Sequence, residues 1–220
     1  MAAAGTLIAV SEGSTLHRVN APISALIAAA LAVTMVGCSG SGDTAAPAAK
    51  CEEVSVPLTD IPARSDQEPV LRLPQPQGWE RTTKLDSDSI RFAIRDSALA
   101  ADGFTPNAVV TLQKVGADAR TPQQILDAQS QQLVKKLKVT DMKATPGQVC
   151  GSPAQAITYT APKMGKIPPR RATSLATVYQ AGDTNYVATV TVQTVKPDDP
   201  NYAKDSAAII KGFQILPPKK

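Results

Sequence analysis

Residues 171–195 read "RATSLATVYQAGDTNYVATVTVQTV", two strand-like runs separated by a short turn. The runs at 171–180 and 184–195 are rich in Val, Thr and Tyr, which favour β-strands. The connection "AGD" contains Gly182 and is short enough for a hairpin. The second run alternates apolar and polar side chains, namely Tyr186, Ala188, Val190 and Val192 against Thr189, Thr191 and Gln193. This stretch predicts two antiparallel strands in a sheet with one apolar face.

Three further segments have the pattern of strands. They are "SIRFAIRD" (89–96), "NAVVTLQKV" (107–115) and "SPAQAITYT" (152–160). The first alternates three apolar residues with three others, Ile90, Phe92 and Ile94 against Arg91, Ala93 and Arg95. We therefore expect it to be a half-buried strand with its isoleucines and phenylalanine on one face.

The segment "TPQQILDAQSQQLVKKLK" (121–138) has the period of a helix. Thr121 stands at the N-cap, Pro122 at the first helical position and Gln124 at the third, which is the arrangement of a capping box. One face carries Ile125, Leu126, Leu133 and Leu137. An amphipathic helix is predicted here.

A second helix is predicted near the end of the chain, in "DDPNYAKDSAAIIKGF" (198–213). Asp199 is the expected cap, Pro200 the first helical residue and Gly212 the residue that ends the helix. The apolar stripe is Tyr202, Ile209, Ile210 and Phe213. The order of strands, helix, strand meander and helix predicts an α+β fold in which helices cover a largely antiparallel β-sheet.

The first 50 residues differ in character from the rest. Residues 23–36, "ISALIAAALAVTMV", form an uncharged run of signal-peptide length behind the short basic flank "HR". Gly37 and Cys38 follow this run directly. Residues Met35 to Cys38 resemble the lipobox of bacterial lipoproteins, in which the cysteine receives a diacylglyceryl group. The alternative is an ordinary signal peptide cleaved elsewhere.

These features predict a domain order of anchor, tether and folded domain. We expect 1–37 to be a signal peptide, 38–50 a lipidated cysteine with a flexible tether, and 51–220 a single domain. The run before the basic flank is long for a signal and contains Glu12, so translation starting near Leu16 is a further hypothesis. The protein is then exported and lipid-anchored at the outer face of the plasma membrane.

Two cysteines remain in the predicted domain, Cys51 and Cys150. In an oxidising compartment an even pair favours a disulfide, and two free buried thiols are the alternative. Two cysteines without a histidine or a CxxC motif cannot supply a zinc site.

Four segments of the chain together resemble a known protein family. The segment "LRLPQPQGWE" within 68–80, the capped helix after two strands, the meander with the basic connection "KMGKIPPRR" and the ending "AAIIKGFQI" are similar to the LpqN/LpqT family of actinobacterial envelope lipoproteins. The similarity covers about residues 54–216. It implies a PsbP/Mog1-like α/β sandwich, envelope lipid transport and glycolipid binding, with a lipid transporter as partner and no catalytic residues.

The sequence offers little for catalysis. The only histidine, His17, lies in the predicted signal, so the mature protein lacks the usual base at neutral pH. Neither a G-x-S-x-G elbow nor a glycine-rich phosphate loop is present. The carboxylate pairs Asp86/Asp88 and Asp198/Asp199 suit a turn and a helix cap. We expect a non-enzymatic protein without cofactor or metal.

The charge of the chain does not favour nucleic-acid binding, because a net charge of +4 is a mild excess rather than a basic stripe. Ligand contacts are most plausible on the connection 163–171, where four cations lie beside Met164 and Ile167. These are Lys163, Lys166, Arg170 and Arg171. A solvated hairpin is the alternative for them.

Trp79, the single tryptophan, lies either in a pocket or in the core. Two functions follow from the sequence. One is the binding of lipid or glycolipid at the membrane, and the other is a protein-interaction module of the envelope without a small ligand.

Overall fold

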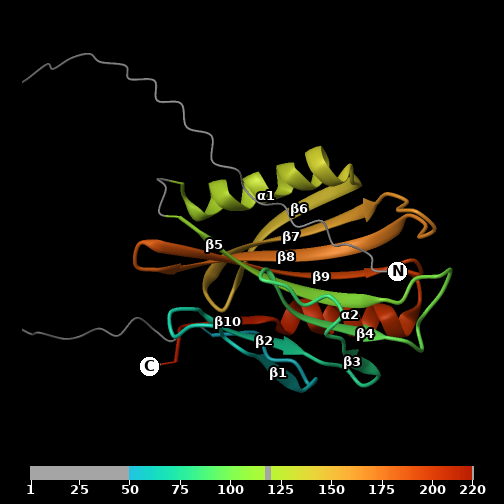
Figure 1. Ribbon diagram of the computed structural model, residues 1–220, viewed down its shortest axis with the longest axis horizontal. Coiled ribbons are helices and arrows are strands. Elements are labelled where there is room, and N and C mark those ends of the chain that lie inside the picture. Colours follow the sequence, from blue (N-terminus) through green and yellow to red (C-terminus); the bar gives the residue numbers. More distant parts are fainter. Residues whose placement is uncertain (1–49, 117–119, 220) are drawn as a thin grey trace, which may run out of the picture. The chain divides into compact units, whose positions relative to one another are not determined.

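The structure is a computed structural model that describes residues 50–116 and 120–219 (Figure 1). The predicted signal, the lipidation of Cys38 and most of the predicted tether lie outside the described residues. Among the described residues, no helix is both long and apolar enough to cross a bilayer.

The larger of two sheets is antiparallel and has seven strands. In spatial order they are β3 (Trp79–Arg81), β4 (Ile90–Asp96), β5 (Asn107–Val115), β9 (Thr184–Thr194), β8 (Arg170–Ala181), β7 (Ser152–Ala161) and β6 (Thr140–Val149). The hairpin predicted in 171–195 is confirmed, because Ala181 pairs with Thr184 across a two-residue loop. Gly182 in this loop has a φ of 57°, a conformation that glycine adopts without steric cost.

The smaller sheet has three strands in the order β1-β2-β10. They are β1 (Leu58–Ile61), β2 (Val70–Pro74) and β10 (Gln214–Leu216). The last strand of the domain thus pairs with one of the first, Ile215 with Leu71.

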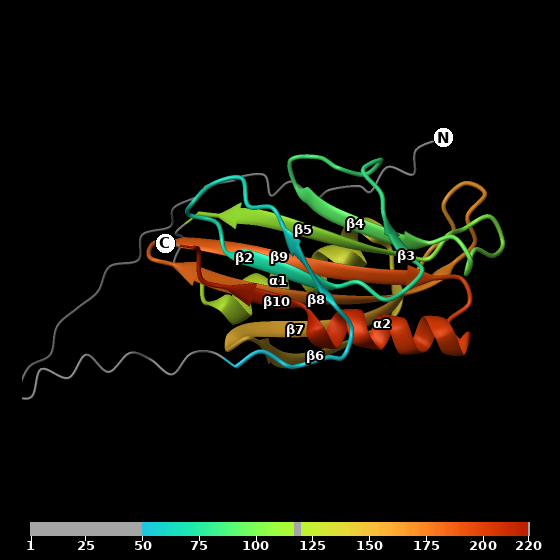
Figure 2. The ribbon, with the colours of Figure 1, turned by 90° about the horizontal axis from the view of Figure 1, so that it is seen from below.

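Each helix covers one face of the large sheet (Figures 1 and 2). Helix α1 (Pro122–Leu137) packs on β7 and β8, whereas α2 (Pro200–Gly212) packs between β2 and the other face of β8 and β9. The Thr121 hydroxyl accepts a hydrogen bond from the backbone N–H of Gln124, and the Gln124 side chain accepts one from the backbone N–H of Thr121, so the predicted capping box is confirmed. The α+β prediction is confirmed as well.

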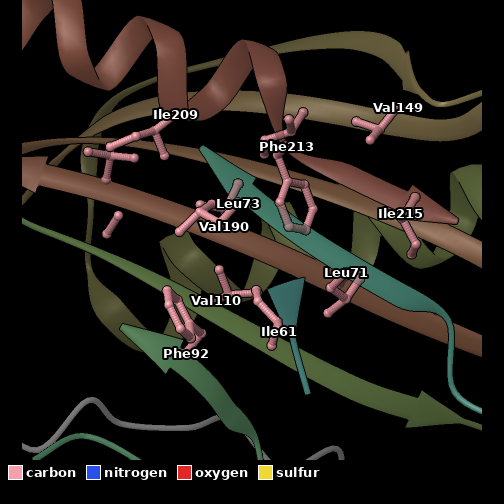
Figure 3. Packing of buried hydrophobic residues seen from close by; sticks show 14 of the residues in the cluster. Ile61, Leu71, Leu73, Phe92, Val110, Val149, Val190, Ile209, Phe213 and Ile215 are labelled. Carbon is pink, nitrogen blue, oxygen red and sulfur yellow. The ribbon is translucent and has the colours of Figure 1, made fainter. Parts of the chain in front are cut away.

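The main core lies between the large sheet and the layer formed by α2 and the small sheet. Figure 3 shows Phe92, Val110 and Val190 of the large sheet facing Leu73 and Phe213. Two smaller apolar clusters lie under α1. One contains Ile125, Leu126, Ala176, Val178 and Val187, and the other contains Val139, Ile157, Tyr159, Ala161 and Ala172.

Gly212 is the last residue of α2, as predicted, but it does not act as a left-handed cap. It is still helical, and the residue after it, Phe213, has an ordinary extended backbone rather than a left-handed one. A Cβ on Gly212 would lie 2.4 Å from a methyl of Val54 and 2.7 Å from Pro74. Glycine is needed here because the N-terminal arm crosses the helix at this point, so tertiary packing and not capping explains it.

The prediction for β4 was wrong in one respect. A β-bulge lies between Ile90 and Phe92, so Ile90 pairs with Thr111 while Phe92 pairs with Val110. Ile90 therefore faces the opposite side from Phe92, although the alternation placed them together. Bulges of this kind redirect a side chain, and the residue redirected here is Arg91.

Strand β6 was not predicted from the sequence. It lies at the edge of the large sheet, and nine of its ten residues are exposed or partly exposed. The strand shows no alternating apolar face in the sequence. It is held in the sheet by its backbone pairing with β7. The short strands β1 and β10 were also missed, since their pairing depends on residues far away in the sequence.

Candidate functional site

The strand register defines two ends of the large sheet. At one end lie the β6–β7 turn, where Val149 pairs with Ser152, and the β8–β9 loop. We call this the disulfide end, because a disulfide joins Cys51 to Cys150 in the β6–β7 turn. The other end holds the β7–β8 connection (162–169), the end of α1 and the start of β6, and we call it the basic end.

The disulfide fixes the point at which the chain enters the domain. Cys150 and Gly151 form the two-residue turn between β6 and β7, with φ values of 48° and 81°. Both positive values are those of a type I′ hairpin turn. The predicted pairing of Cys51 with Cys150 is therefore present in the structure.

A pocket of about 280 Å³ lies at the disulfide end, between the loop 62–69 and the large sheet. We call it the loop pocket. Its lining residues are Arg64, Ser65, Gln67, Glu68, Asp88, Arg91, Leu112, Lys114 and Tyr186. Leu112 and Tyr186 belong to the main core and form an apolar floor, whereas the other lining residues are polar or charged. The volume is near the lower end for small-molecule sites.

Arg91 and Glu68 form the buried wall of the loop pocket. The two side chains are 4 % and 15 % exposed and make a bidentate pair, with Nη1 at 2.9 Å from Oε1 and Nη2 at 2.7 Å from Oε2. Nη2 also donates to the carbonyl of Pro62 at 3.2 Å. The bulge in β4 turns Arg91 toward this loop, so the pair holds residues 62–69 against the sheet.

The pKa of the Glu68 carboxyl lies below its ordinary value of 4.5. The largest cause is the hydrogen bonding from Arg91, which stabilises the carboxylate, while burial acts in the opposite direction. The backbone N–H of Arg64 donates to the same carboxylate at 2.8 Å and lowers the pKa further. Glu68 is therefore ionised at neutral pH.

Among the described residues on the exposed rim of the loop pocket, Lys114 is a cation without an ion pair. The Arg64 guanidinium donates to the carbonyls of Ser87 and Asp88 at 2.7 and 2.9 Å. Lys114, which pairs with Tyr186 in the sheet, is exposed and makes no ion pair with any described residue. An anionic or hydroxyl group entering the pocket meets this ammonium group above an apolar floor.

The chemistry of the loop pocket suits binding. Carboxylate oxygens of Glu68 and Asp88 can accept hydrogen bonds from hydroxyl groups, and Lys114 can donate to an anion. Within residues 50–116 and 120–219, no group of three or more His, Cys, Asp or Glu residues is placed to hold a metal ion.

Trp79 lies in the main core and is 2 % exposed. Its indole N–H donates to the carboxylate of Asp205 on α2 at 3.0 Å. It is not among the residues that line the loop pocket. Of the two places predicted for Trp79, a pocket or the core, the structure shows it in the core.

The four cations predicted as contacts lie at one end of the sheet but not on one face of it. Lys163 and Lys166 are exposed at the tip of the β7–β8 connection, where Met164 and Ile167 bridge. Arg170 and Arg171 are consecutive strand residues and so point to opposite faces of the sheet.

Arg170 is the most constrained of the four. Its Nε donates to Oε1 of Gln193 at 2.6 Å, and its guanidinium lies 5.5 Å from the centre of the Phe104 ring. Burial lowers its pKa. Arg171 is exposed and donates to the hydroxyl of Thr160 at 3.1 Å. Their contact with a ligand stays a prediction.

Sequence reasoning missed the loop pocket. Arg91 was placed on the polar face of a strand, because alternation does not reveal a bulge. Glu68 is 23 residues away from Arg91 and carries no local signal of pairing. A charged residue within the apolar run of β4 was the one available hint.

Comparisons with known proteins agree with the fold. The family model described as "Probable lipoprotein LpqN" (Lpp-LpqN) matches residues 51–216. No curated protein matches the sequence. The crystal structure of LpqN, which is described as involved in cell envelope biogenesis of Mycobacterium tuberculosis, superposes with a TM-score of 0.57 at 16% identity. The match covers 74% of this chain and 93% of that one.

The Ran-binding protein Mog1p of Saccharomyces cerevisiae is also similar, with a TM-score of 0.44 and 12% identity over 74% of this chain and 97% of that one. The predicted LpqN resemblance is confirmed by the family model and by the LpqN structure. Identities this low concern the fold alone.

Proposed function

The chain belongs to the Lpp-LpqN family of lipoproteins, and from this we propose that it is a non-enzymatic envelope protein that binds the polar headgroup of a lipid or glycolipid. The loop pocket is the observation that supports this proposal most directly. Its polar rim and apolar floor suit a sugar ring or another hydroxyl-rich headgroup. Its volume of about 280 Å³ favours a headgroup over a whole acyl chain.

The setting of the site also supports a membrane ligand. We propose that Cys38 carries a lipid anchor, as its lipobox-like sequence suggests. The thirteen residues from there to Cys51 reach at most about 45 Å. The loop pocket lies at the same end of the sheet as Cys51, so a headgroup of the anchoring bilayer is within its reach. Transfer to a lipid transporter remains part of the proposal.

The anchor is tested with Cys38→Ala. Because the thiol is the acylation point, we expect the variant protein to leave the detergent-rich phase in phase partitioning, while wild type stays in it. A variant that partitions like wild type excludes acylation at this cysteine.

The pocket is tested by native mass spectrometry of protein purified from its own membrane. Ser65 lines the pocket and is exposed, so Ser65→Trp places a large side chain over the mouth without disturbing the core. We expect bound lipid on wild type and about tenfold less on the variant, equivalent to 1.4 kcal/mol.

Ala63→Trp is the matched control, because Ala63 is exposed in the same loop but does not line the pocket. This variant should keep its lipid. Equal lipid on all three proteins shows that the pocket is not the binding site. Lys114→Gln then distinguishes an anionic headgroup, whose binding weakens, from a neutral one.

The alternative of a protein-interaction module has less support. The exposed edge strand β6 contains Pro146 and a bulge after Thr140, both of which hinder pairing with another strand. Among the described residues, the exposed large apolar side chains are Leu58, Val134 and Met164, which lie on three different elements. They do not form the contiguous apolar patch of a stable protein interface.

A further inference from the structure

The described part of the chain gathers cations at the basic end. Two segments, 133–143 and 161–172, meet there through the small cluster of Val139, Tyr159 and Ala161 that packs under α1. The two segments carry eight cations, on both faces of this end of the sheet: Lys135, Lys136, Lys138, Lys143, Lys163, Lys166, Arg170 and Arg171. Figure 1 shows the end of α1 and the β7–β8 connection at the same end of the sheet.

These cations are not neutralised. None of the eight makes an ion pair with a described residue, and Asp141 is the one carboxylate in the two segments. Eight cations thus stand against one acidic residue, while the whole chain has a net charge of +4, so the rest of the chain is net negative. In contrast, Arg72 and Arg91 elsewhere in the domain are paired with carboxylates.

Local structure explains only part of this arrangement. Lys135 and Lys136 lie in the last turn of α1, where cations interact favourably with the helix dipole. Lys143 on β6 and Lys163 and Lys166 on the β7–β8 connection have no such role, and all are exposed. The topology brings them to the end of the sheet at which α1 ends, although the sequence separates them.

The basic end lies far from the point where the chain enters the domain. The ten residues of β7 separate it from Cys150, a distance of about 30 Å along the strand. The chain enters the domain at Cys51, at the opposite end. The loop pocket, rather than the basic end, therefore shares its end of the sheet with the point where the chain enters the domain.

We propose that the basic end binds a linear polymer that carries phosphate or carboxylate groups along its length. Exposed lysines spread over several elements suit repeated weak contacts with such a chain rather than one fixed pocket. The exposed apolar side chains at this end, Val134 and Met164, include no aromatic residue and come from different elements. The surface thus lacks the apolar centre of a protein interface. This site is independent of the loop pocket.

The test uses the full-length lipoprotein in neutral detergent micelles, with soluble polyphosphate and polygalacturonate as probes. The variant Lys135→Gln, Lys136→Gln, Lys163→Gln and Lys166→Gln removes two cations from each segment. At low salt we expect its dissociation constant for polyphosphate to rise about tenfold or more, and wild-type binding to weaken steadily as salt is added.

The control removes the same number of charges elsewhere, with Lys50→Gln, Lys84→Gln, Lys204→Gln and Lys219→Gln. All four residues are exposed and lie outside the two segments. The control should bind polyphosphate like wild type, and circular dichroism should show both variants folded.

Three results would overturn the proposal. One is no binding of either polymer at low salt, and another is an equal loss in the control, which would reduce the effect to net charge. The third is tighter binding to vesicles containing anionic lipid than to either polymer, lost in the first variant, because that assigns the basic end to a bilayer. Loss of polymer binding with lipid still held in the loop pocket separates this proposal from the proposed function.

Discussion

Replacing Cys51 and Cys150 by serine is expected to lower the free energy of unfolding by about 4–5 kcal/mol. The disulfide closes a loop with a sequence separation of 99, and the chain-entropy model gives about 4.7 kcal/mol for a loop of 100 residues. Most of this effect lies in the unfolded chain, which gains freedom when the link is absent. Urea unfolding of wild type and variant, both with Cys38→Ser, measures it.

The fold itself should survive this change. The arm after Cys51 is also held by Val54, which packs on Gly212, and by a hydrogen bond from Gln75 to the carbonyl of Pro57 at 2.9 Å. We expect an unchanged circular dichroism spectrum and faster proteolysis between 51 and 56. Reduced wild type is the control and should match the double variant. Two reactive thiols in the denatured, unreduced Cys38→Ser protein would contradict the disulfide.

Replacing Arg91 by methionine is expected to lower the free energy of unfolding by about 3 kcal/mol. The variant leaves the Glu68 carboxylate, which is 15 % exposed, without its bidentate partner. The same substitution at Arg72 is the matched control, because its pair with Asp60 is exposed at 36 % and 60 %. An exposed pair contributes about 0–1 kcal/mol. Equal losses at Arg91 and Arg72 would show that burial of the pair has no energetic consequence.

The Arg91 effect should depend on pH. In wild type the pKa of Glu68 is below 4.5, so the pair contributes stability above that pH and loses it as pH falls through the lowered pKa. In Arg91→Met, burial raises the pKa of Glu68, so the carboxyl becomes neutral earlier on acidification. The difference in stability between the two proteins should be largest at neutral pH and narrow below about pH 4.5. Adding Glu68→Gln to the variant should recover part of the loss at neutral pH.

The sequence alone determined the elements whose signals are local. Helix α1 was predicted with its cap because Thr121, Pro122 and Gln124 interact within one helical turn. The β8–β9 hairpin was predicted because its two strands are adjacent and alternate apolar and polar residues. Asp199 was correctly predicted as the cap of α2 for the same reason. These features depend on contacts between residues a few positions apart.

The exposed edge and the short strands needed tertiary contacts. Strand β6 has no apolar face, so nothing in its side chains distinguishes it from a loop before β7 pairs with it. Strand β10 pairs with β2, which lies more than a hundred residues earlier in the chain. Position 212 requires glycine because Val54 and Pro74 leave no room for a side chain, a reason that capping patterns do not contain.

Only the tertiary structure decided the two candidate sites. The loop pocket depends on a bulge that turns Arg91 toward Glu68, and alternation in the sequence cannot show an extra residue in one strand. The basic end depends on α1 and the β7–β8 connection lying at one end of the sheet, opposite the disulfide. The sequence determined which residues carry charge and which are apolar, but long-range pairing and packing determined which of them meet, because the free energy of those contacts belongs to the folded chain as a whole.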